Sequence, residues 1–140
     1  ASGFALVSRC IEIVKGVKIL DVSYILSFDE LLTLLTLAKT QTNECRHFAD
    51  SVLTDAKLIP LNGLITKGLA TRIDGKIRID TVLRMLIDTI ATAETIEERK
   101  ECWHLKGEHI NVNIALYPHI ARHIKIIPIQ KEGAIYENVS

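Results

Sequence analysis

The residues best suited to chemistry crowd one short stretch, where four of the five histidines lie between positions 104 and 123 and a cysteine stands just before them. Zinc is held by three or four N, S or O ligands at about 2.0 to 2.3 Å, and Cys102, His104, His109, His119 and His123 offer the right atoms. Cys102 and His104 share one face of a strand, and His119 and His123 share one face of either a helix or a strand. Because neither Cys-x2-Cys nor His-Glu-x-x-His occurs, we expect exposed or strand-flanking histidines, with no metal and no cofactor.

Acid-base catalysis is the second chemistry that this stretch could support. Glu108 could serve as a general base beside His109. No nucleophile or oxyanion arrangement accompanies the pair, and a hydrolytic site needs both. We therefore expect a protein that is not an enzyme.

Basic residues are densest in "GLATRIDGKIRIDTVLRML" and the lysine before it. This segment is similar to the helix-turn-helix pattern in having Leu69-Ala70, a glycine at the turn (Gly75) and Thr81-Val82-x-Arg84. One extra residue precedes the glycine and another follows it, a departure that a winged-helix variant would tolerate. The alternative to a binding surface is a hairpin and a core helix with solvated arginines. The nucleic-acid-binding candidates are Lys67, Arg72, Lys76, Arg78 and Arg84.

A seven-residue repeat of small and apolar residues follows Leu31, with successive spacings of four and three. Such a seam favours close packing of helices, either within one chain or between chains. "TQTNEC" could divide it into two helices. The seam comprises Leu31, Leu35, Ala38, Thr42, Cys45, Ala49, Val52 and Ala56.

Composition excludes several classes of protein. Lys plus Arg and Asp plus Glu are 17 each, so the chain has no overall charge to steer it toward nucleic acid. No apolar run approaches the roughly 18 residues that cross a bilayer. Three widely spaced cysteines, Cys10, Cys45 and Cys102, favour a reducing, cytoplasmic location over a disulfide framework. The start at Ala1 without methionine suggests processing, or excision from a longer protein.

Periodicity predicts helices in the first two thirds of the chain. Residues 4–15 have apolar spacings of three and four, and 17–22 suggest a short strand. Ser27 and Glu30 form a capping box that starts a helix. Asp74-Gly75 predicts a two-residue hairpin turn, and Asp80 precedes a helix with a wide apolar stripe.

The last third of the chain is predicted to hold a helix and two strands. Thr95 to Glu98 form a second capping box, so "EERKE" reads as a solvated helical surface. Alternation predicts strands at 110–116 and 123–129, with Pro128 placing the second at an edge or ending it. We therefore expect one domain, 1–140, of the α+β class, predominantly helical with a small antiparallel sheet in the C-terminal third.

The expected function is that of a non-catalytic structural or interaction domain. With 48% apolar residues and no net charge, the chain should form a homo-oligomer or bind a protein partner. The alternative is a domain that binds nucleic acid through residues 67–84.

Overall fold

A computed structural model describes residues 22–130 of the chain. Its helices are α2 (Phe28–Thr36), α3 (Asn43–Val52), α4 (Asn62–Thr66) and α5 (Thr81–Ala91). Its strands are β1 (Tyr24–Ser27), β2 (Ala70–Ile73), β3 (Lys76–Ile79), β4 (Thr95–Arg99), β5 (Cys102–Lys106), β6 (Ile110–Leu116) and β7 (His123–Gln130). The predicted helix at 4–15 and all but the last residue of the predicted strand at 17–22 lie outside this range, and Val22 precedes β1.

Five strands form one antiparallel sheet in the order β1-β7-β6-β5-β4. The register aligns Ile114 of β6 with Ile126 of β7, and Asn113 of β6 with His104 of β5. Since successive side chains of a strand point to opposite faces, these two rows lie on different sides of the sheet. The row with Ile114 is buried and defines the inner face, and the row with His104 defines the outer face.

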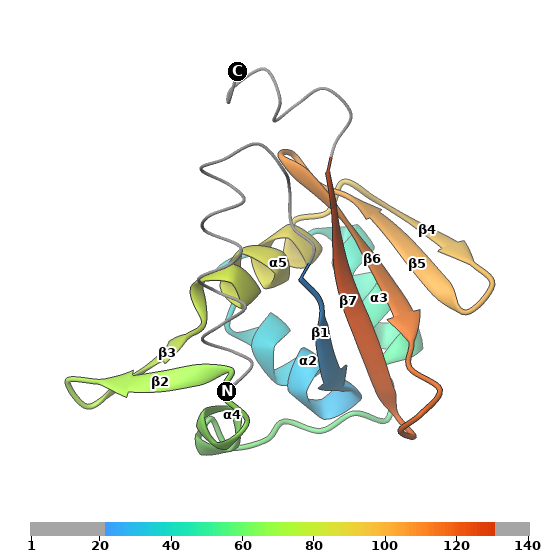
Figure 1. Cartoon of the computed structure of the whole chain (residues 1–140). Helices are drawn as coiled ribbons and strands as arrows, with labels where there is room; N and C mark the ends of the chain where they lie inside the picture. The colour runs from blue at the N-terminus through green and yellow to red at the C-terminus, as the bar shows by residue number, and fades with distance from the viewer. Residues whose placement is uncertain (1–21, 131–140) are drawn as a thin grey trace.

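Helices α2, α3 and α5 cover the inner face of the sheet (Figure 1). The core between them is almost entirely aliphatic, with Leu31, Leu83 and Leu105 among its fully buried side chains. β2 and β3 form a separate two-stranded hairpin, which lies with α4 away from the sheet (Figure 1).

The prediction of a predominantly helical protein is wrong. The described residues are 32% helical and 34% strand, and the sheet has five strands, one of which, β1, comes from the first quarter of the chain. β1 pairs with β7 over residues that are about a hundred positions apart in sequence. A pairing between segments so far apart in sequence cannot be detected from the periodicity of either segment alone.

The capping box at Ser27 is confirmed. Ser27 Oγ accepts from the Glu30 amide at 3.0 Å, and a Glu30 carboxylate oxygen accepts from the Ser27 amide at 2.7 Å. The hairpin is also confirmed, with Asp74 and Gly75 at φ values of 51° and 77° in the turn between β2 and β3. α5 follows Asp80 as expected.

The helix predicted at Thr95 is wrong, because residues 95–99 form β4. Each residue of β4 pairs with one of β5, from Thr95 with Lys106 to Arg99 with Cys102. "TIEER" contains a single apolar residue, so it has no apolar stripe that could hold a helix against the core. "EERKE" is nevertheless solvent-exposed, as expected.

The strand predicted at 123–129 is confirmed as β7, which continues through Pro128 to Gln130. β7 lies between β6 and β1, so the prediction of an edge strand is wrong for the strand as a whole. The pairing with β1 stops at Ile126, however. Pro128 therefore lies where one side of β7 has no strand partner among the described residues, which is where proline is tolerated.

The turn between β5 and β6 depends on Gly107. A Cβ atom added there would lie 2.5 Å from the backbone oxygen of Ile110 and 2.6 Å from Cγ2 of Thr89. Both distances are shorter than real Cβ contacts, so glycine permits the close approach of this turn to α5.

Across residues 22–130, no helix has the length and apolar character needed to cross a membrane.

Candidate functional site

The four histidines of the stretch lie in four different parts of the fold. His104 lies on the outer face of β5, where its Nδ1 is 2.6 Å from Asn113 Oδ1. His109 is in the turn between β5 and β6, and His119 is in the turn between β6 and β7, stacked edge-on against Tyr117. His123 begins β7, and its Nδ1 is 2.9 Å from the Ala121 carbonyl oxygen.

These positions do not bring the metal candidates together. Cys102 and His104 do share the outer face of β5, but β6 lies between them and His123. Two strand spacings are about 10 Å, which is too far for both sides to reach one zinc ion at about 2 Å. Within residues 22–130 no group of three or more His, Cys, Asp or Glu side chains could hold a metal ion.

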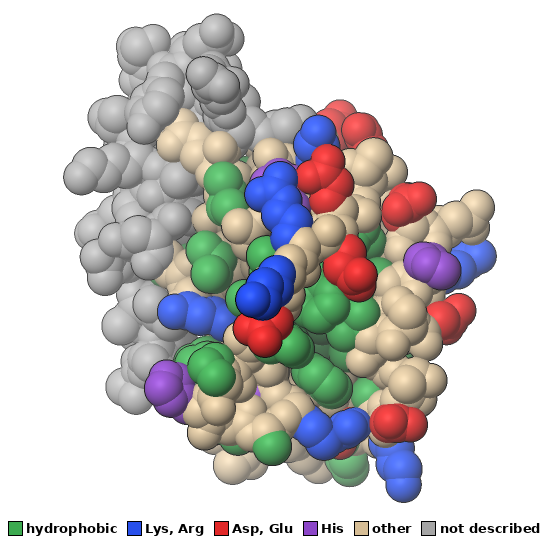
Figure 2. Space-filling model, turned by 90° about the vertical axis from the view of Figure 1, so that its right-hand side faces the viewer, with side chains coloured by type: hydrophobic (Ala, Val, Ile, Leu, Met, Phe, Trp, Pro, Cys, Tyr) green, Lys and Arg blue, Asp and Glu red, His purple; other side chains and the backbone are tan. Residues whose placement is uncertain are grey.

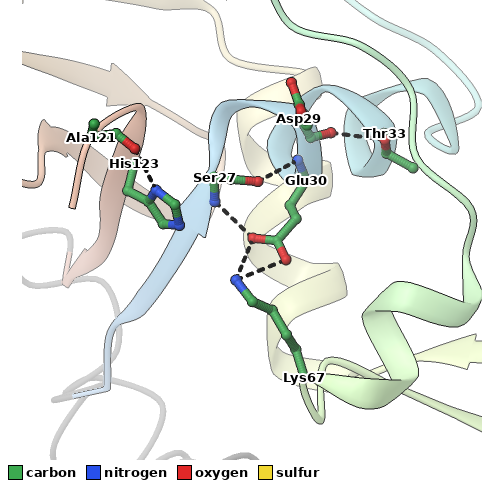
Figure 3. Close-up of polar contacts among 7 residues, drawn as sticks. All are labelled: Ser27, Asp29, Glu30, Thr33, Lys67, Ala121 and His123. Carbon is green, nitrogen blue, oxygen red and sulfur yellow. Dashed lines mark hydrogen bonds and ion pairs between the residues drawn. The ribbon is translucent and has the colours of Figure 1, made fainter.

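Lys67, a nucleic-acid candidate, is engaged by a carboxylate of its own chain. Its Nζ is 2.9 Å from each oxygen of Glu30, whose side chain is only 6% exposed. Figure 3 shows the arrangement, in which Glu30 binds the Ser27 amide on one side and the Lys67 ammonium on the other. Lys67 therefore ties the connection after α4 to the first turn of α2.

The other basic candidates do not form one surface. Arg72 donates to Asn62 Oδ1 at 2.6 Å, and Arg84 Nε lies 3.9 Å from the Asp88 carboxylate. Lys76 and Arg78 are exposed on β3 and share a face of the hairpin, whereas Arg72 points to the opposite face.

The helix-turn-helix arrangement is not formed. Gly75, expected at a turn between two helices, lies in the β2–β3 turn, and the helix after it is α5. The segment forms a hairpin followed by a core helix, with Lys76 and Arg78 exposed.

The seven-residue seam is divided between two helices of one core. α2 ends at Thr36 and α3 begins at Asn43, so the break covers residues 37–42, which include the first three residues of "TQTNEC". Leu31, Leu35 and Cys45 are buried within the chain. Thr42 caps α3 through the Cys45 amide and donates to the Ala93 carbonyl at 2.9 Å. The remaining members, Ala38, Ala49, Val52 and Ala56, are partly buried against the same core.

A groove that the sequence did not predict lies between α3 and the β4–β5 hairpin. It encloses about 230 Å³. One wall is the face of α3 formed by Glu44, His47, Phe48 and Ser51. The other wall consists of the inner-face residues Ile96, Glu98 and Trp103. We call this feature the α3–β4 groove.

Two aromatic rings form the apolar part of the α3–β4 groove. Phe48 and Trp103 meet edge to face with centroids 5.5 Å apart and an interplanar angle of 79°. The Trp103 indole N–H donates to Glu98 Oε1 at 3.3 Å, so that carboxylate lies at the edge of the indole ring. Figure 2 views the molecule from the side of β4 and β5, and hydrophobic side chains are visible in the middle of this face with both acidic and basic side chains around them.

β4 is also an edge of the sheet. It is the last strand in the order, and it pairs only with β5 in the part of the chain that the structure describes. An edge strand presents alternate N–H and C=O groups without a partner in the ladder. The groove and these groups lie side by side.

Within residues 22–130 two titratable groups have a perturbed pKa, and neither lines the groove. Burial raises the pKa of the Cys45 thiol to about 11, against a smaller lowering by Arg46. Burial also raises the pKa of Asp80, and the hydrogen bond from the Tyr24 hydroxyl at 2.5 Å opposes that shift.

One compositional signal pointed toward the groove. The chain has a single tryptophan and three phenylalanines, so a surface that contains Trp103 beside Phe48 uses two of its few aromatic side chains. The helix predicted over residues 95–98 concealed the pairing of Glu98 with Trp103.

No protein-family model matches the chain, and no curated protein or solved structure gives a match either.

Proposed function

We propose that this chain is a non-catalytic interaction domain that binds another protein at the α3–β4 groove. The observation that carries the proposal is an aromatic groove beside a strand edge that has no partner in residues 22–130. Tryptophan is enriched among the residues that dominate binding energy at interfaces, and edge strands are ready templates for pairing.

The polar chemistry of the described residues is consistent with such a role. Cys45 is a buried thiol with a raised pKa, which disfavours the reactive thiolate. Lys67 and Arg72 bind groups of their own chain. No specific contact favours nucleic-acid binding, which stays an untested alternative.

The test compares a blocked groove with a matched surface change on the same helix. Ser51 lines the groove and is exposed, so Ser51→Trp fills it from α3, whereas Asp50→Trp places the same side chain on an exposed position outside the lining. Random linear peptides displayed on phage are selected against the full chain, and light scattering follows its mass up to high micromolar concentration.

We expect the chain either to select peptides or to form a defined oligomer. The Ser51→Trp chain should lose this binding, and the Asp50→Trp chain should keep it. A monomer that selects no peptide would overturn the proposal. Equal binding by both variants would overturn the groove as its site.

A further inference from the structure

The α3–β4 groove also indicates what kind of partner segment it accepts. We propose that the occupant is an extended segment of another protein, which joins β4 as a sixth strand and inserts a lysine or arginine side chain into the groove. This inference rests on the proposed function and narrows it to one class of ligand.

The strand edge favours an extended segment over a helix. β4 offers backbone groups along Thr95 to Arg99, and strand addition satisfies them with main-chain hydrogen bonds while alternate side chains enter neighbouring pockets. The inner-face side chains of β4, Ile96 and Glu98, line the groove. Every second side chain of an added strand would therefore point to the same side as the groove.

The charges of the groove favour a basic side chain. Glu44 and Glu98 stand in its walls, and no lysine or arginine within residues 22–130 forms an ion pair with either of them. On the outer face of the same strand, by contrast, Glu97 is paired with Arg99 at 3.1 Å. The carboxylates of the groove are thus open to a cation from a partner.

The apolar floor suits a long side chain with a charged end. Phe48, Ile96 and Trp103 can pack against methylene groups, while the carboxylates meet the head group. Lysine and arginine combine these two properties, since they bury their stems and keep their charged ends in polar surroundings.

A second copy of this chain is a poor occupant of the same edge. Two β4 strands pairing symmetrically and antiparallel about their acidic residues would place Glu97 or Glu98 opposite a glutamate of the other copy. Like charges directly opposite each other destabilise a strand pair. The acidic strand therefore favours a different protein with a basic strand.

The test uses random linear peptides displayed on phage, followed by synthesis of the selected sequences. We expect the selected peptides to share a lysine or arginine at one fixed position among alternating β-forming residues. Exchanging that residue for norleucine removes a hydrogen bond between charged groups, and Glu98→Gln in the full chain removes the charge of its acceptor, so each change should weaken binding about tenfold. Asp50→Asn, the matching change at an exposed carboxylate of α3 outside the lining of the groove, should leave affinity unchanged.

Strand addition is tested on the peptide, which leaves the fold of the chain untouched. N-methylation of alternate peptide amides should abolish binding in the register that faces β4 and leave binding intact in the other register. Peptides that lack a shared basic residue, bind the Glu98→Gln chain as well as wild type, or tolerate N-methylation in both registers would overturn the inference. If such peptides nevertheless fail to bind the Ser51→Trp chain, the proposed function stands and only the inference of a basic, strand-forming partner is overturned. If no peptide is selected, the inference is also overturned.

Discussion

Replacing Glu30 by alanine should weaken the fold at the junction of α2 with the segment after α4. One carboxylate oxygen accepts from the Ser27 amide at 2.7 Å and from Lys67 Nζ at 2.9 Å. Losing a capping interaction costs about 1 kcal/mol. Because the Lys67 side chain is 45% exposed, water replaces part of its interaction, and the ion pair adds at most about 1 kcal/mol.

We therefore expect Glu30→Ala to lower the free energy of unfolding by about 2 kcal/mol, the sum of these two losses. For a domain of this size the change corresponds to roughly 10 °C in Tm. Glu30→Gln keeps an oxygen for the Ser27 amide and loses the charge, so about 1 kcal/mol is expected. Urea unfolding followed by circular dichroism measures both.

The control for this series is Glu97→Gln, an exposed carboxylate on β4, which should change stability by no more than about 0.5 kcal/mol. A double-mutant cycle of Glu30→Gln with Lys67→Met should give a coupling energy of about 0.5 kcal/mol or more. The reasoning is refuted if Glu30→Ala unfolds within about 0.5 kcal/mol of wild type at an unchanged denaturant slope.

Three further predictions concern other parts of the fold. Gly107→Ala should lower the free energy of unfolding by about 1–3 kcal/mol because of the clash at the β5–β6 turn. Gly63→Ala, with open space at its Cβ position, should leave it unchanged or raise it by up to about 1 kcal/mol. Equal values for the two variants in urea unfolding would contradict this prediction. The pKa of Asp80 in the folded state lies above its ordinary value of 3.8. Between these two pKa values the folded state binds more protons than the unfolded state, so the free energy of unfolding rises as the pH falls. Relative to wild type, Asp80→Asn should therefore be most stable at neutral pH and lose that advantage as the pH approaches 3.8, and a difference independent of pH in urea unfolding would argue against a perturbed carboxyl. Iodoacetamide should modify Cys102 before Cys45, whose pKa of about 11 leaves little thiolate, and peptide mapping by mass spectrometry that found the reverse order would exclude the burial of Cys45.

The two capping boxes show how far local sequence predicts this fold. Both Ser27 and Thr95 are followed three residues later by glutamate, yet only the first starts a helix. After Ser27 the chain provides Leu31, Leu34 and Leu35, which give a helix an apolar face to bury. "TIEER" has no such face, and it forms a strand by pairing with β5. Cross-strand pairing depends on another segment, so it cannot be read from one window.

The same limit explains why the α3–β4 groove could not be predicted. α3 and β4 are separated by more than forty residues, and α4, β2, β3 and α5 lie between them in sequence. The members of the seven-residue seam are buried or partly buried in the core of one chain. Periodicity alone could not separate burial within one chain from burial between chains.

The binding surface is mapped most directly by nuclear magnetic resonance, with a selected basic peptide titrated into the ¹⁵N-labelled full chain. Binding at the groove should shift the amides of β4, Thr95–Arg99, and of α3, Asn43–Val52, and leave those of β2 and β3 unchanged. Shifts confined to the β2–β3 hairpin or to β7 would contradict the account.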